Sequence, residues 1–252
     1  MTTLRERVLG GETTFGTWLS TGSPVVAEAC ARAGFDWVVI DTEHGMTTET
    51  TVLGQLYAIG TTGATALVRI ERSDRLRISR VLDMGAGGVV VPRVESAADV
   101  AEALTWMRFP PEGQRGIALG GRGQGFGQVG HADIGTLNDV VLGVFQIENA
   151  AAVADVEAIA ALPGADVVFV GPADLSHALG VPGRFDDATY LDAVSAVVGA
   201  CNAHGKAAGI LIYDRAVIAR HLELGFRFIG LGSDLGFVAA GARGMVEAAK
   251  GA

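Results

Sequence analysis

The sequence is poor in lysine, in cysteine and in long apolar runs. Its 252 residues include only two lysines, Lys206 and Lys250, and two cysteines, Cys30 and Cys201. The net charge of −9, without clustered basic residues, argues against a nucleic-acid partner or an anionic membrane surface. Both cysteines fall in apolar, helix-like segments, which predicts reduced thiols rather than a disulfide. No apolar run approaches the roughly 18 residues of a membrane span, and the N-terminus lacks the apolar stretch of a secretory signal. We therefore expect a cytoplasmic protein.

What the sequence has in abundance is apolar residues and glycine. Hydrophobic residues make up 49% of the chain, and 36 residues are glycine. Short β-branched runs alternate with longer alanine- and leucine-rich segments, which is the pattern of repeated strand–helix units. The alternation predicts these strands: Phe15–Ser20, Trp37–Asp41, Thr65–Ile70, Gly88–Val94, Val141–Glu148, Val167–Gly171, Ala207–Tyr213 and Arg227–Leu231.

Each predicted strand is followed by a predicted helix. The helices are expected to begin near Pro24, Thr48, Ser73, Ala97, Ala150, Asp186, Arg215 and Leu235. Eight such units in 252 residues predict an α/β protein with one (β/α)8 (TIM) barrel as a single domain over residues 1–252. In such a barrel the chemistry lies on the loops after the carboxyl ends of the strands.

The second predicted strand ends in Asp41, and Glu43 and His44 follow on its loop. Histidine titrates near neutral pH and can act as a general base. We therefore favour a functional His44 over a merely solvated loop residue. For Asp41 and Glu43 the two interpretations stay equal.

The third predicted strand ends in Arg69. Alternation along the strand points its side chain to the same side as Leu67, towards the barrel mouth, where an arginine needs an anionic partner. The alternative is an arginine that extends along the surface into solvent.

Two further strand ends carry carboxylates. Alternation sends Gln146 and Glu148 to one face at the end of the fifth strand, and Asp174 follows the sixth strand. Two such carboxylates can provide hard oxygen ligands for a divalent cation. The alternative for Asp174 is a helix N-cap, and the backbone N–H groups of its turn can also hold a substrate carboxylate.

Other signals are set aside. The GxGxxG spacing at 125–130 follows a loop rather than a strand, so it does not predict a dinucleotide site. His204 and His221 are interpreted as structural, whereas His131 and His177 stay open. Lys206 precedes the seventh strand, at the far end of the barrel from the catalytic loops, and Lys250 lies near the C-terminus. The sequence therefore offers no lysine for a Schiff base.

Taken in order, several segments resemble the metal-dependent, pyruvate-using class II aldolases of the HpcH/HpaI family, which includes hydroxyketoacid and 4-hydroxy-2-oxoheptanedioate aldolases. The resemblance covers nearly the whole chain. Its segments are 41–44 (DTEH), Arg69, Asp83 in 81–85 (VLDMG), 91–94 (VPRV), 111–116 (PEGQRG), 146–148 (QIE) and 171–176 (GPADLS).

The resemblance implies a role for individual residues. Glu148 and Asp174 would bind the cation (Mg²⁺, Mn²⁺ or Co²⁺), with Gln146 beside them, and Arg69 would contact pyruvate oxygens. His44 would transfer the proton and Asp83 would orient His44. The set is completed by the residues that would bind the two substrates: Ala173 and Asp174, through their amides, for the pyruvate carboxylate, and Trp18 and Leu211 for the aldehyde.

The resemblance also implies reversible cleavage of a 4-hydroxy-2-oxoacid to pyruvate and an aldehyde through a pyruvate enolate beside the cation, in a homohexamer that exchanges a C-terminal helix between subunits. The alternatives are a lyase acting on CoA thioesters, as in citrate-lyase-like proteins, and a barrel that binds a ketoacid without catalysis. One segment departs from the family pattern: the glycine-rich stretch Gly120–Gly127, which contains Arg122. It lies within a long irregular loop, for which we expect a role at the acceptor side or in a subunit contact.

Overall fold

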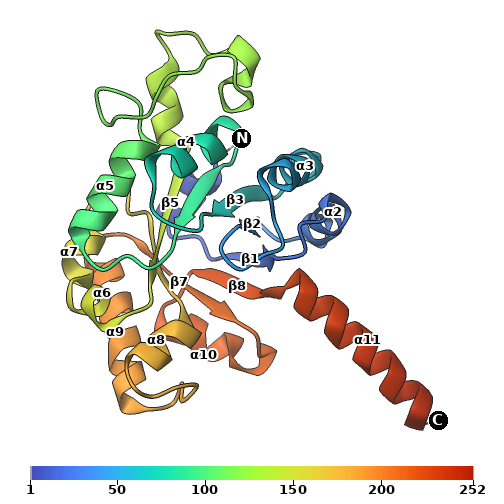
Figure 1. The fold of residues 1–252 in the computed structure, drawn as a ribbon. Coiled ribbons are helices and arrows are strands. Elements are labelled where there is room, and N and C mark those ends of the chain that lie inside the picture. Colours follow the sequence, from blue (N-terminus) through green and yellow to red (C-terminus); the bar gives the residue numbers. More distant parts are fainter. Residues whose placement is uncertain (1, 252) are drawn as a thin grey trace.

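The computed structural model describes residues 2–251, and its parallel strands close into one barrel in sequence order, each paired with the next and the last with the first (Figure 1). The strands are β1 Thr14–Leu19, β2 Trp37–Asp41, β3 Thr65–Arg69, β4 Gly88–Val91, β5 Leu142–Ile147, β6 Val167–Val170, β7 Ala207–Ile212 and β8 Phe228–Ser233. The predicted barrel and all eight predicted strands are confirmed.

Helices surround this barrel. The α-helices are α1 Leu4–Leu9, α2 Pro24–Arg32, α3 Glu49–Ile59, α4 Arg75–Asp83, α5 Ala97–Met107, α6 Ala150–Ala154, α7 Val156–Ala161, α8 Pro172–Ala178, α9 Ala188–Ala203, α10 Ile218–Leu224 and α11 Asp234–Gly251. Short 3-10 helices occur at η1 Arg122–Gly127, η2 Ile134–Asp139 and η3 Arg215–Val217.

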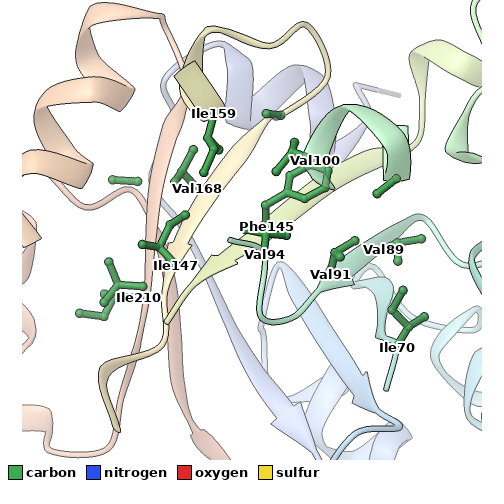
Figure 2. Close-up of a cluster of buried hydrophobic side chains, with 14 of the residues drawn as sticks. Ile70, Val89, Val91, Val94, Val100, Phe145, Ile147, Ile159, Val168 and Ile210 are labelled. Carbon is green, nitrogen blue, oxygen red and sulfur yellow. The ribbon is translucent and has the colours of Figure 1, made fainter. Parts of the chain in front are cut away.

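Alternate strand residues face two separate cores. The outward residues pack under the helices. Figure 2 shows part of this layer, where Phe145 of β5 lies beside Val100 of α5, and Val168 of β6 beside Ile159 of α7. The inward residues fill the barrel with a smaller apolar cluster that includes the stacked rings of Trp37 and Phe228. Both faces of the sheet are therefore buried, as the continuous apolar runs predict.

Glycines make room for the large rings inside the barrel. A side chain on Gly16 would collide with the Trp37 ring, and one on Gly230 would collide with Trp18. Each glycine leaves room for an aromatic ring from a neighbouring strand inside the barrel. Part of the high glycine content is therefore a packing requirement of the barrel interior.

Helices α1 and α8 lie outside the predicted pattern, and the helix predicted near Ala150 is divided at Asp155 into α6 and α7. Helix α1 precedes the first strand, and its Leu4 and Val8 pack on the inward apolar cluster. Helix α8 begins directly after β6, ahead of the predicted helix near Asp186, which corresponds to α9. The fourth strand is also shorter than predicted, because Pro92 lacks a backbone N–H and Arg93 adopts a positive φ of 53°.

Helix α11 extends away from the barrel (Figure 1). Its first turn is attached through Phe237, whose ring stacks on Phe35 of the segment that follows α2, with 6.4 Å between ring centroids. Further along the helix, Val238, Met245 and Val246 are exposed. Within residues 2–251, none of the helices has the length and apolarity needed to cross a membrane.

Candidate active site

A cavity of about 290 Å³ lies at the carboxyl ends of the strands. It brings together residues that the sequence places up to 195 positions apart, from Trp18 on β1 to Tyr213 after β7. Among its lining residues are all of the predicted site residues except Asp83: Trp18, His44, Arg69, Gln146, Glu148, Ala173, Asp174 and Leu211.

Arg69 is fixed by the strand register, which pairs it directly with Asp41. Its Nε and Nη2 donate to the two oxygens of Asp41 at 2.9 and 2.7 Å, and Nη1 lies 3.0 Å from Glu43 Oε2. Burial lowers the pKa of Arg69, but the two carboxylates outweigh this effect, and the pKa lies above its ordinary value. Arg69 is therefore a permanent cation with N–H groups to spare at the cavity.

Asp41 also shapes the loop that carries His44. Its Oδ1 accepts hydrogen bonds from the backbone N–H groups of Glu43 and His44, at 3.0 and 3.2 Å. The imidazole of His44 is 69% exposed, and its Nε2 lies 3.9 Å from Glu43 Oε2. The loop backbone is thus held in place while the imidazole remains free to contact a ligand and solvent.

Glu148 and Gln146 lie side by side, as the strand alternation predicts. Gln146 Nε2 donates to Glu148 Oε1 at 2.7 Å, and the backbone N–H of Arg93 donates to Glu148 Oε2 at 3.3 Å. Burial, followed by the nearby Asp174 and Glu43, raises the pKa of Glu148 to about 7. Arg69 opposes this rise but does not cancel it.

Asp174 lies in the first turn of α8, but it is not the N-cap, which is Gly171. No side chain caps this helix, and Pro172 contributes no N–H, so the N–H groups of Ala173 and Asp174 begin the helix at the cavity. The N-cap alternative for Asp174 is therefore wrong, because Asp174 occupies the third helical position. Gly171 is required next to Glu148, since a side chain there would collide with its carboxylate.

Asp83 lies away from the other predicted residues. At the end of α4, its Oδ1 accepts hydrogen bonds from Arg115 at 2.8 Å and from Gln124 at 3.0 Å. Within one chain it does not line the cavity that contains His44. The predicted contact between Asp83 and His44 is therefore not seen within one chain.

The glycine-rich segment has a structural explanation. Arg122 donates to the carbonyl oxygens of Met84 at 3.1 Å and Leu56 at 3.4 Å, and its guanidinium lies over the ring of Tyr57. It therefore attaches the loop to the ends of α3 and α4. The expected role at the acceptor side is not seen within one chain, because none of the residues Gly120–Gly127 lines the cavity.

Other predictions about chemistry can be checked directly. Lys206 donates to the carbonyl oxygen of Leu162, and neither lysine lines the cavity. His204 pairs with Glu157 at 2.7 Å, also outside the cavity. The GxGxxG segment lies in a loop region around η1, which agrees with setting it aside.

Sequence reasoning did not select three aromatic residues of the cavity: Phe169, Phe185 and Tyr213. Phe169 lies two positions before Gly171 on an inward face, so alternation along β6 was the signal that could have found it. Phe185 and Tyr213 lie on loops outside the strands, where no periodicity operates.

A barrel with a polar cavity at the carboxyl ends of its strands, containing a base, an arginine and paired carboxylates, has the organisation of a barrel enzyme. Comparison of the sequence with known protein families supports this class. Residues 14–240 match the family model described as HpcH/HpaI aldolase/citrate lyase. The chain therefore belongs to this family.

Individual relatives support the same assignment. A hydroxypyruvate/pyruvate aldolase of Paraburkholderia phytofirmans is 39% identical, over 92% of this chain and 91% of the relative. A 5-keto-4-deoxy-D-glucarate aldolase of Klebsiella pneumoniae is 37% identical, over 93% and 91%. The crystal structure of a family protein from Burkholderia cenocepacia is 35% identical with a TM-score of 0.94, covering 99% of this chain and all (100%) of the other.

Proposed function

We propose that this chain is a divalent-metal-dependent class II aldolase that cleaves 4-hydroxy-2-oxoacids reversibly to pyruvate and an aldehyde. The observation that carries the proposal is the excess of carboxylates at the cavity. Asp41, Glu43, Glu148 and Asp174 face a single guanidinium, Arg69. Asp41 takes two N–H groups of Arg69 and Glu43 lies 3.0 Å from a third Arg69 nitrogen, so the carboxylates of Glu148 and Asp174 are left for a cation.

The donor set fits a hard cation such as Mg²⁺, Mn²⁺ or Co²⁺. Glu148 and Asp174 offer carboxylate oxygens, and Gln146 Oε1 is a buried acceptor with no hydrogen-bond partner among residues 2–251. Within residues 2–251, no group of three or more His, Cys, Asp or Glu side chains forms a complete metal cage. Two carboxylates leave further coordination positions for water and substrate, which is how catalytic sites for such cations are commonly built.

A cation held by Glu148 and Asp174 would supply Lewis acidity towards the oxygens of a ketoacid. The residues of the chain perform the remaining work. The N–H groups of Ala173 and Asp174, at the positive end of α8, would bind the pyruvate carboxylate. Arg69 has unused N–H groups for the oxygen that gains negative charge when C3 of pyruvate loses a proton.

We assign the proton transfer at C3 of pyruvate to His44. Its exposed ring can exchange the proton with water, and general base catalysis of this kind contributes about 10²–10⁴-fold. Trp18 and Leu211 bound the apolar side of the cavity, where the aldehyde would bind. Asp83 can orient His44 only if a second chain brings the two together.

We also propose that the subunits exchange α11 in a homohexamer. The support is a helix of 18 residues that extends away from the barrel and leaves the apolar side chains of Val238, Met245 and Val246 exposed. Size measurement in solution, with and without the residues after Gly241, tests this assembly. A cytoplasmic location stays a prediction from the sequence.

The decisive experiment is deuterium exchange at the methyl group of pyruvate, because it tests enolisation without knowledge of the acceptor. We expect exchange with Mg²⁺, Mn²⁺ or Co²⁺ and none after exhaustive chelation. The variant Glu148→Ala should lose exchange, whereas Glu102→Ala, which removes an exposed carboxylate on α5, should keep it. Exchange that survives chelation would refute the metal dependence.

Cleavage of a CoA thioester without any pyruvate exchange would favour the citrate-lyase-like alternative. Tight pyruvate binding without exchange would favour a non-catalytic barrel.

A further inference from the structure

A second cavity adjoins the candidate active site. It has a volume of about 390 Å³ and lies between α9, the end of β7 and α10. Pro172, Phe185, Leu211 and Tyr213 line both cavities. The second cavity, called the outer cavity below, therefore adjoins the site, and these four residues form the boundary that the two cavities share.

The interior of the outer cavity is apolar. Val194 and Ile212 are buried in its wall, and Leu191 and Val217 add partly buried aliphatic side chains. The charged residues that line it are exposed and therefore lie at its rim: Asp186, Asp214 and Arg220. Because two of these three are acidic, the rim opposes a carboxylate and the interior favours a hydrocarbon chain.

The boundary carries two exposed aromatic side chains. Phe185 is 48% exposed and Tyr213 is 72% exposed. The Phe185 ring meets Tyr190 edge-on, with 5.4 Å between centroids, so one side of it is already packed in the outer cavity. A ligand chain passing between the two cavities would bury the remaining faces of both rings, which is a favourable change.

The positions of the polar groups fix the direction of such a ligand. Glu148, Arg69 and the first turn of α8 are placed for the ketoacid half, while Leu211 lies where the two cavities meet. An aldehyde carbon next to the pyruvate C3 would therefore direct its substituent past Leu211 towards Phe185 and Tyr213.

We propose that the outer cavity binds the apolar substituent of the acceptor, so that the substrates are 4-hydroxy-2-oxoacids with an alkyl or aryl group beyond C4, selected by Phe185 and Tyr213. This inference rests on the proposed aldolase function. In the condensation direction a bond forms between C3 of pyruvate and the aldehyde carbon, C3 loses one proton, and the aldehyde oxygen gains one. No other reactant is required.

The test is the specificity constant kcat/KM for condensation of pyruvate with acetaldehyde, butanal, hexanal and 3-phenylpropanal, in the presence of Mn²⁺. Each CH₂ group that is fully buried is expected to raise kcat/KM by up to about fourfold. We therefore expect hexanal and 3-phenylpropanal to exceed acetaldehyde by at least about tenfold. Equal or falling values along the series would overturn the proposal.

Variants locate the effect in the outer cavity. Val217→Trp fills this cavity from a position that does not line the active-site cavity, and it should abolish the advantage of hexanal over acetaldehyde. Val25→Trp makes the same change on the exposed face of α2 and should leave the advantage intact. If Val217→Trp does not fold, Leu191→Phe fills the same cavity and should reduce the advantage. An advantage that persists in a folded filled-cavity variant would overturn the proposal.

Deuterium exchange of pyruvate distinguishes a failure of the proposed aldolase function from a failure of the proposed role of the outer cavity. Wild-type protein that fails to exchange with any of the three cations refutes the aldolase function itself. Exchange accompanied by no preference for longer aldehydes refutes only the role of the outer cavity.

Discussion

The buried carboxylate of Glu148 makes the metal-free protein less stable at high pH. Its side chain is only 7% exposed, and its pKa rises from an ordinary value of 4.5 to about 7. At about 1.36 kcal/mol for each pKa unit, this difference corresponds to about 3 kcal/mol. The penalty is fully present above pH 7, where the carboxylate is ionised in both folded and unfolded states. It is absent below pH 4.5, where both states are protonated.

The variant Glu148→Gln should therefore be more stable than the wild type at pH 8 and not at pH 4.5. Removing the charge relieves about 3 kcal/mol, and loss of the bond from the Arg93 N–H offsets about 1 kcal/mol of this gain. The net gain of about 2 kcal/mol raises Tm by roughly 4–8 °C in a chain of this size. At pH 4.5 the variant should equal the wild type or be slightly less stable.

The assay is thermal or urea unfolding of chelated protein at pH 4.5 and pH 8, at one fixed protein concentration, since assembly shifts apparent stability. Glu102→Gln removes one exposed carboxylate and provides the control for a general change of net charge. Adding Mn²⁺ at pH 8 should stabilise the wild type more than the variant. If Glu148→Gln gains the same free energy at both pH values, the argument from burial and neighbouring carboxylates is refuted.

Three further substitutions test the geometry of the site. Arg69→Ala leaves Asp41 as an uncompensated buried charge and should destabilise the protein by about 3–5 kcal/mol, measured by urea unfolding. His44→Ala removes an exposed ring and should change stability by less than about 0.5 kcal/mol, while pyruvate exchange falls about 10²–10⁴-fold; an exchange rate equal to that of the wild type would remove His44 from the mechanism. Gly171→Ala places a methyl group against the Glu148 carboxylate and should weaken Mn²⁺ binding in calorimetry, and unchanged affinity would show that the carboxylate can move aside.

The strands could be predicted because each is a short, β-branched apolar run that is followed by a longer segment with helical spacing. Alternation also predicted that Arg69 shares a side with Leu67 and that Gln146 shares a face with Glu148, and a hydrogen bond now joins the latter pair. The sequence could not reveal that Asp41 would take two N–H groups of Arg69. That contact depends on the register between β2 and β3, which period alone does not determine.

Residues on loops and short helices were harder to place. Asp83 could be assigned only by resemblance, and its contacts with Arg115 and Gln124 come from a loop whose path no local rule determines. Helix α8 is only seven residues long and begins immediately after a strand, so it lacks a separate apolar period. Phe185 and Tyr213 were not selected from the sequence for a related reason. Both lie on loops that come together only when the barrel is closed.

The arrangement of charge explains why a cation suits this cavity better than a lysine does. A Schiff-base lysine would have to emerge from a strand end and remain uncharged, yet Glu43 and Glu148 both have raised pKa values from burial and would favour its charged form. A divalent cation has the opposite requirement, because each buried, desolvated carboxylate attracts it more strongly than a hydrated one would. Under the proposed function, the burial that destabilises ionised Glu148 would also increase its attraction for a metal. Both effects would follow from one position, directly after the end of β5.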